Sequence, residues 1–515
     1  MAGKLSPNAG REGPRCANRQ RGVTLLIVIV LLSLLIGFVV IGFAGDLARQ
    51  NRKNQQTTDA LAMAKEALIG YASGVDLNPS PSCTGAPNCV RPGDLPCPDT
   101  DNDGVAEGSC GNASGTTGQA ARLGRLPWKT LGLHDLRDGD SERLWYAVSN
   151  NFKNNVRSSC LLPGQAGYVP GAEAACLNSD ARGSITVRDN AGVIVNNGTN
   201  PDPFTPSGAI AVIVSPGSVL QRQGSVAMQD RSAAGVDDPI NYLDVGNGED
   251  NAAFSDGGVD GFIAGAIYDT GGALIVNDRL LSITYADLIP VLERRVAREV
   301  QNCLTGYAAA SYGRYPWAAR IDDSATGDYS SKQTYRFGRL PEQFGDTLLG
   351  LVPAAGPLAG VVSLVCGLTP FICMSNGWPS PTATPACNIA LGSWWSNWKE
   401  QVYYGVAAAY EPAATVQLIP PAVTVPPPGG CGVPGNCMTV NPPSAAEDKQ
   451  VVVIVAGKQL APVAGGQPRG TTAEKSDPFN YLEGSNATNV ANAPSNFTFS
   501  QQPATASFND YLLFQ

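Results

Sequence analysis

The chain has 515 residues, a net charge of −9 and a single histidine, His134. This length exceeds one ordinary domain, and 58 glycines and 39 prolines beside 43% hydrophobic residues indicate a loop-rich globular body that contains β-structure. A single histidine excludes a multi-histidine zinc site, and the acidic balance argues against nucleic acid as a partner. The sequence offers no nucleophile–base set, so we do not predict an enzyme.

The N-terminus combines a basic stub with a long apolar run. Residues 1–22 carry five basic residues against Glu12 alone, and residues 23–44 follow without a charge. This run is long enough to cross a bilayer as a helix, with its basic end held in the cytoplasm. Apolar residues continue at helical spacing beyond it, so we predict one long helix over 23–75, half membrane and half soluble. A cleaved secretory signal and a simple membrane anchor are the alternatives.

The rest of the chain contains a diverged internal duplication. Seven short segments recur in the same order: 66–72 with 302–308, 93–98 with 313–318, 123–127 with 337–341, 145–148 with 403–406, 209–214 with 451–455, 238–244 with 477–483, and 276–281 with 508–513. Each copy is predicted to be a helix followed by a loop-rich sheet, which gives an α+β fold. We divide the body into a first unit (76–283), a second long helix (284–312) and a second unit (313–515).

Local patterns refine this division. Thr284 and Asp287 suit the N-cap and third position of the second helix. The repeated sequence DPxNYL[D/E] is expected to form a turn ahead of a buried Tyr-Leu pair; a ligand or ion site at Asp238, Asn241 and Asp244 is the alternative. Charged residues on the second helix are expected to form a solvated face. They are Glu293, Arg294, Arg295, Arg298 and Glu299.

Cysteine usage indicates an oxidising compartment. Apart from Cys16 in the basic stub, the number of cysteines is even. They are Cys83, Cys89, Cys97, Cys110, Cys160, Cys176, Cys303, Cys366, Cys373, Cys387, Cys431 and Cys437. Short spacings predict four local bridges, 83–89, 97–110, 160–176 and 431–437. Residues 303, 366, 373 and 387 would form two more, one of which ties the apolar insertion 351–374 to the second helix. That insertion is either a disulfide-tied loop packed on the body or an exposed partner-binding patch.

One short segment has the pattern of a calcium loop. Asp99, Asp101 and Asp103 alternate ahead of Gly104, and Glu107 follows. Oxygen ligands at alternating positions before a turn-forming glycine suit Ca²⁺. Cys110 stands where an EF-hand needs its bidentate glutamate, so the segment resembles instead the DxDxDG loops of extracellular calcium repeats. The alternative is an acidic turn without an ion.

The junction of stub and apolar run, Arg21-Gly22-Val23-Thr24-Leu25-Leu26, resembles the prepilin signal of type IV pilins and type II secretion pseudopilins. The resemblance implies that a membrane-bound prepilin peptidase cuts between Gly22 and Val23 and methylates the new N-terminus. It also implies assembly with other pilin or pseudopilin subunits, and a helix-then-sheet head that is here doubled. Cleavage would remove Cys16.

One position departs from the family pattern. Family members usually carry glutamate at the fifth mature position, where this chain has Ile27. In the family that carboxylate pairs with the N-terminal amine of a neighbouring subunit, and members without it resemble tip or initiating subunits. We therefore expect a large minor or tip subunit, anchored by a single pass in the inner membrane, with its body in the periplasm or at a filament tip. A stand-alone membrane-anchored adhesin or carbohydrate-binding protein is the alternative.

Overall fold

In the computed structural model, the described residues include both predicted long helices and the repeated strand segments. The described residues are 18–75, 91–108, 110, 122–153, 176–200, 202, 204, 208–225, 227–232, 236–253, 261–311, 313–322, 329–332, 334–344, 378–379, 387, 389, 394–412, 430–461, 466–489 and 497–515. Residues 1–17 of the predicted leader and the insertion 351–374 lie outside them.

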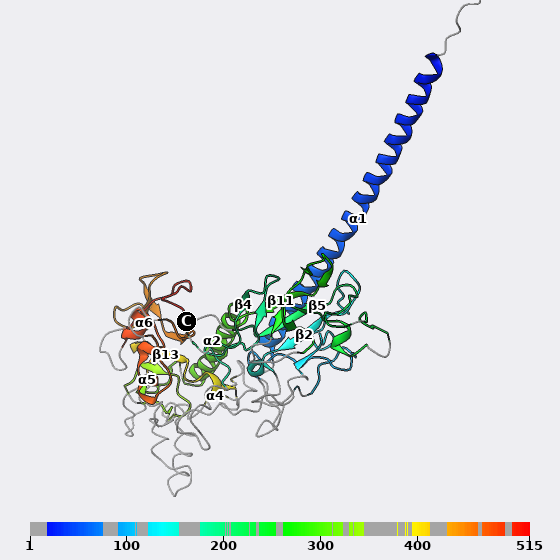
Figure 1. The fold of residues 1–515 in the computed structure, drawn as a ribbon. Coiled ribbons are helices and arrows are strands. Elements are labelled where there is room, and N and C mark those ends of the chain that lie inside the picture. Colours follow the sequence, from blue (N-terminus) through cyan, green and yellow to red (C-terminus); the bar gives the residue numbers. More distant parts are fainter. Residues whose placement is uncertain are drawn as a thin grey trace, which may run out of the picture.

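Helix α1 spans Asn18–Gly74 and has two halves with different surroundings. Its N-terminal half extends away from the body as a single rod (Figure 1), and the apolar residues from Leu25 to Ile36 are 47% to 66% exposed. Its C-terminal half enters the body and buries Ala60, Leu61 and further apolar residues at helical spacing. Within the described residues, no helix meets the length and hydropathy needed to cross a membrane.

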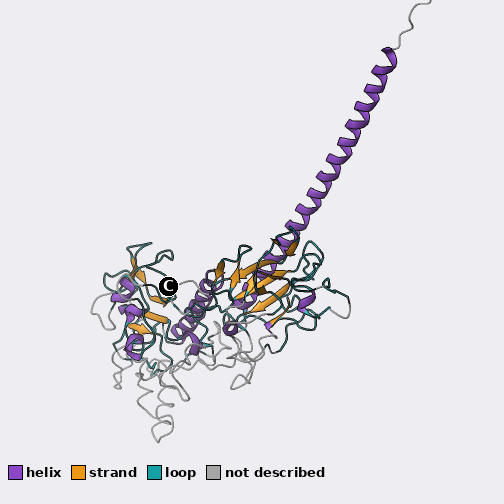
Figure 2. Ribbon diagram, viewed as in Figure 1, coloured by secondary structure: helices purple, strands orange, loops and turns teal. Residues whose placement is uncertain are grey.

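Two four-stranded antiparallel sheets form the core of the body (Figure 2). The first has the order β1 (Leu123–Arg125), β2 (Trp145–Val148), β5 (Ala211–Ser215) and β11 (Arg279–Ile283). The second has the order β12 (Phe337–Arg339), β13 (Val402–Val406), β16 (Val451–Val455) and β18 (Tyr511–Phe514). The sheets therefore share one topology, as the duplicated sequence segments predict.

Strand register is also shared between the two sheets. One row of paired residues crosses the first sheet through Arg125, Trp145, Val214 and Leu280. The matching row of the second sheet is Arg339, Tyr403, Ile454 and Leu512. Because a slip of one residue would turn every side chain to the opposite face, this identity fixes which positions of the two units correspond.

Smaller elements flank the sheets. The short strands are β3 (Val187–Arg188), β4 (Ile194–Asn196), β6 (Val245–Gly246), β7 (Glu249–Asp250), β8 (Phe262–Ile263), β9 (Ile267–Tyr268), β10 (Leu274–Val276), β14 (Met438–Val440), β15 (Glu447–Lys449) and β17 (Thr498–Phe499). The short helices are α4 (Trp395–Trp398), α5 (Thr472–Lys475), α6 (Ser485–Thr488), η3 (Asn150–Phe152), η5 (Pro239–Asn241), η8 (Ala408–Tyr410) and η9 (Pro478–Asn480). The turns η5 and η9 are the two DPxNYL[D/E] segments, and the Tyr-Leu pair after each is buried, as predicted.

Helix α2 (Tyr285–Ala310) lies between the two sheets (Figure 1). The backbone N–H of Thr284 donates to Asp287 at 2.8 Å, so the predicted cap is present. Asp287 also forms an ion pair with Lys65 of α1 at 2.8 Å. Leu292 and Val296 of α2 belong to one apolar core that includes residues of both sheets. The two units therefore share a core through this helix.

The predicted solvated face of α2 is wrong for its two glutamates. Glu293 and Glu299 are only 6% and 7% exposed, whereas Arg294 and Arg298 are exposed. Glu299 is paired with Arg295 at 2.9 Å. Burial raises the pKa of Glu293 to about 8, against the opposing effect of the nearby Ser179 hydroxyl. The residues that bury Glu293 include the segment around Asp180, more than 100 positions upstream, which helix periodicity cannot reveal.

Three disulfides join described residues. Cys97–Cys110 and Cys431–Cys437 are two of the four expected local pairs. Cys176 is also disulfide-bonded, while its expected partner Cys160 lies outside the described residues, as do Cys83, Cys89, Cys366 and Cys373. Cys303 of α2 pairs with Cys387, so the observed bridge from the second helix reaches beyond the insertion 351–374 instead of into it.

The long-range bridge should stabilise the fold more than the short one. Cys303–Cys387 closes a loop of 84 positions and Cys431–Cys437 closes one of 6. Chain entropy then predicts that the double variant Cys303→Ala/Cys387→Ala loses about 2 kcal/mol more unfolding free energy than Cys431→Ala/Cys437→Ala. Denaturant titration of the full chain measures both losses, and equal losses would contradict the expectation.

Glu293 should make stability fall with rising pH. The folded chain keeps the Glu293 proton up to about pH 8, whereas the unfolded chain releases it near the ordinary pKa of 4.5. Stability should therefore decrease between these values by up to about 1.4 kcal/mol per pH unit and level off above them. Glu293→Gln removes this contribution, so the variant should be more stable than the parent at pH 7.5, and the difference should shrink toward pH 5.

Glu299→Gln is the matched control, because Glu299 is equally buried on the same helix but has the cationic partner Arg295. The measurement is denaturant unfolding of parent and variants across this pH range. A constant difference between parent and Glu293→Gln would show that Glu293 does not titrate as argued.

Candidate functional site

The repeated LGRLP and FGRLP segments each place an arginine between two aromatic rings. The guanidinium carbon of Arg125 lies 4.2 Å from the ring centre of Trp145 and 3.9 Å from that of Tyr242. The matching arginine, Arg339, lies 4.9 Å from Tyr403 and 4.6 Å from Tyr481. Both arginines are buried and donate to backbone carbonyls. Such stacking orients the cation and fastens the DPxNYL turn to the sheet.

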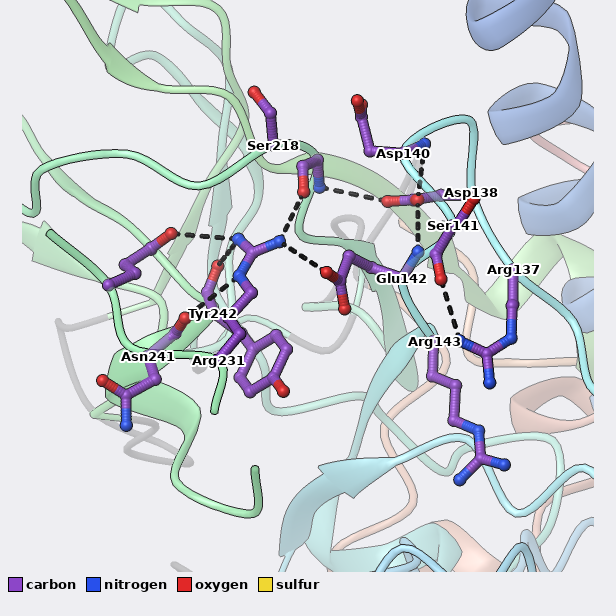
Figure 3. A network of polar contacts seen from close by, with 12 residues as sticks. Arg137, Asp138, Asp140, Ser141, Glu142, Arg143, Ser218, Arg231, Asn241 and Tyr242 are labelled. Atoms are coloured by element: carbon purple, nitrogen blue, oxygen red, sulfur yellow. Dashed lines mark hydrogen bonds and ion pairs between the residues drawn. The ribbon is translucent and has the colours of Figure 1, made fainter. Parts of the chain in front are cut away.

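A second arginine in each unit holds the loops around that turn, and Figure 3 shows the one in the first unit, Arg231. Arg231 donates to the carbonyls of Asn241 at 3.2 Å and Gly217 at 2.7 Å, and pairs with Glu142 at 3.2 Å. Arg469 makes the matching backbone contacts, to Asn480 at 2.6 Å and Gly457 at 3.0 Å. Its carboxylate partner, however, is Asp180, which belongs to the first unit and lies 2.9 Å away.

The loop that carries Glu142 is organised by one buried carboxylate (Figure 3). Asp138 accepts the backbone N–H groups of Asp140 and Glu142, each at 2.9 Å, through one oxygen. Its other oxygen accepts the Ser215 hydroxyl at 2.8 Å and the Gly217 N–H at 3.1 Å. Because hydrogen bonds engage both carboxylate oxygens, Asp138 attaches this loop to the end of β5 and the residues that follow it.

The acidic loop 99–107 is the candidate metal centre. One ligand oxygen each from Asp99, Asp101 and Glu107 lies within 4.8 Å of the others. Ca²⁺ binds oxygens at about 2.3–2.6 Å, so opposite ligands of one ion stand up to about 5 Å apart, and the cluster fits. Asp99 is buried, and burial together with its acidic neighbours raises its pKa. A cation would relieve that repulsion.

The same carboxylates also shape the loop. Asp99 accepts the N–H of Gly104 at 2.7 Å, and Gly104 has the positive φ of 89° that favours glycine. Glu107 accepts the hydroxyl of Thr100 at 2.6 Å. Asp103, the fourth predicted ligand, lies outside the cluster, and its carboxylate accepts the N–H of Val105 at 2.6 Å. Three of the four predicted ligands therefore come together.

The remaining predicted positions lie on α1. Gly22 and Val23 are in its first turns, where the structure describes the backbone alone. Ile27 is 52% exposed on the free half of the helix. Sequence reasoning missed Glu293 and Lys458, which line a cavity in the second unit. It placed Glu293 on a solvated face and assigned no role to Lys458.

Comparison with known proteins adds no relative. No family model, curated protein or solved structure matches this chain. The function of the chain is therefore inferred from the contacts described above and from the N-terminal signal.

Calcium should stabilise the protein through the three clustered carboxylates. Asp101→Asn keeps a side-chain oxygen for the N–H of Asp103 but removes one charge, and it should abolish the rise in melting temperature produced by millimolar Ca²⁺. Extracellular calcium modules typically bind with Kd of about 10⁻⁴ to 10⁻³ M. Asp103→Asn is the matched control and should retain the rise, because Asp103 lies outside the cluster. A parent chain that shows no Ca²⁺-dependent rise would refute the site.

Proposed function

We propose that this chain is a large minor pilin or pseudopilin-like subunit, acting at the tip of a type IV pilus or type II secretion-type filament in assembly, adhesion or partner binding. The observation that carries the proposal is the division of α1. Its C-terminal half is built into the body, whereas its N-terminal half stands free with exposed apolar side chains. A subunit that passes from a bilayer into a helical filament core needs this division.

The free half of α1 requires a partner. Contiguous exposed apolar surface on this scale marks a membrane or protein interface, because leaving it in water is unfavourable. Lipid would cover it before assembly, and the apolar helices of neighbouring subunits would cover it afterwards. The Gly22–Val23 junction and the basic stub favour this over a simple anchor, since they supply the processing signal.

Ile27 and the size of the body favour a terminal position. A subunit within a filament docks beneath earlier subunits, and the family glutamate helps to set that register. A first subunit has nothing above it, so an apolar residue there avoids an unpaired carboxylate in lipid. Two sheets with their loops would also crowd an array of small pilins, but they fit at its end.

Processing and position together test the proposal. In cells that contain a prepilin peptidase, the mature chain should begin with a methylated Val23. Gly22→Leu should block this cleavage, whereas the same change at Gly37, a glycine inside the apolar run and away from the junction, should leave it unchanged. Mass spectrometry of the N-terminus measures the first expectation, and immunogold labelling should place few copies at one end of a filament.

Three outcomes would overturn parts of the proposal. An N-terminus beyond Ala44 would show secretory cleavage. Gold particles along the whole shaft would remove the tip assignment. Labelling of the envelope alone, with no filament association, would favour the stand-alone adhesin.

A further inference from the structure

A cavity of about 810 Å³ lies between the start of α2 and loops of the second unit. Helix α2 contributes Tyr285, Pro290, Glu293 and Arg294, and the other walls come from loops next to β14, β16 and β18. This volume is in the range of small-molecule sites, about 300–1,000 Å³.

Two basic side chains line the cavity. Lys458 and Arg294 are among its lining residues, and neither forms an ion pair within the described part of the chain. Lys458 is 5.4 Å from the ring centre of Tyr285, and burial together with nearby Arg182 lowers its pKa. Burial raises the pKa of both lining carboxyl groups, that of Glu293 to about 8, and burial together with nearby Glu483 raises that of Asp510.

The corresponding groove of the first unit is bridged. There Arg279 reaches across to α1 and donates to the carbonyl of Asn54 at 3.1 Å and to Thr58 at 2.9 Å. Strand register places Tyr511 of β18 where Arg279 stands in β11. The open cavity is therefore a divergence between the two copies and not a consequence of the shared fold.

The other walls suit a hydroxylated ring. Pro290, Pro442, Pro443 and Pro503 offer flat apolar surface, and Gln501 and Gln502 bring side-chain amides that both donate and accept. A bare anion such as phosphate would make no apolar contact with the proline walls, and a neutral sugar would not form an ion pair with Lys458 or Arg294.

We propose that this cavity binds an acidic sugar, with the carboxylate at Lys458 and Arg294 and the ring against the prolines. An acidic sugar would be the ligand in the adhesive role proposed above, and this inference rests on that proposed function. Binding by the purified chain is measured apart from cleavage and filament assembly, so either proposal can fail without the other.

The test is a binding titration of the full chain in detergent micelles. The probes are trigalacturonate, cellobiouronate and sialyllactose, each beside its carboxyl-reduced form, with inorganic phosphate as a bare anion. At least one acid should bind and its reduced form should not. Lys458→Gln should weaken that binding about tenfold, as expected for loss of a charge-assisted contact, and Arg294→Gln should weaken it by a smaller factor.

Arg298→Gln is the matched control, because Arg298 is exposed one turn further along α2 and does not line the cavity. Tyr511→Arg installs the residue that bridges the first unit's groove and should block binding; circular dichroism checks that each variant is folded. Binding of none of the acids, equal binding of the reduced forms, binding of phosphate alone, or insensitivity to Lys458→Gln would each overturn the proposal.

Discussion

The second unit depends on a carboxylate that it does not itself supply. Arg469 is buried beneath the DPxNYL turn, and a buried guanidinium without an anion is strongly destabilising. Asp180 of the first unit meets this need. Beside it, Asn397 of the second unit accepts two hydrogen bonds at 2.9 Å, from the Leu177 N–H through Oδ1 and from Asn178 Nδ2 through its backbone carbonyl. Because α2 packs against both sheets at the same junction, the two units share one hydrophobic core and are not independent domains joined by a linker.

Divergence between the copies accounts for both candidate sites. The backbone of Asp99 forms an isolated β-bridge with that of Arg125 at the edge of the first sheet. At the matching edge of the second sheet, the residue that forms the β-bridge with Arg339 is Ala319. The second unit therefore lacks the buried carboxylate around which the acidic loop is built. In the second unit, Tyr511 stands where the first unit has Arg279, so the contact that bridges the first unit's groove to α1 has no counterpart at that position. Each copy kept the framework and specialised at a different edge.

Sequence predicted what is local or repeated, and missed what is brought together over long distances. The Thr284 cap, the paired LGRLP and FGRLP strands and the Cys97–Cys110 bridge involve neighbouring residues or an internal copy for comparison. The burial of Glu293 and the Asp180–Arg469 ion pair both depend on a segment of the first unit that packs against the second unit. The hydrophobic periodicity of these segments does not indicate that contact. Asp103 shows a further limit, because a side-chain oxygen that the sequence pattern assigns to an ion accepts the backbone N–H of Val105 instead.

The positions of the two halves of α1 and of the cavity give the proposed function a direction. The body surrounds the C-terminal half of α1 at the first sheet, and the second unit lies on the side away from the free end of the helix (Figure 1). A chain held by its free apolar half, in lipid or among other helices, would present the second unit furthest from the point of attachment. The open groove with its two basic side chains lies on that side, whereas the first unit, whose groove is bridged to α1 by Arg279, lies next to the helix that would hold the chain. Under the proposed function, the bridged groove would therefore lie beside the point of attachment, and the open groove would lie where a ligand outside the filament could reach it.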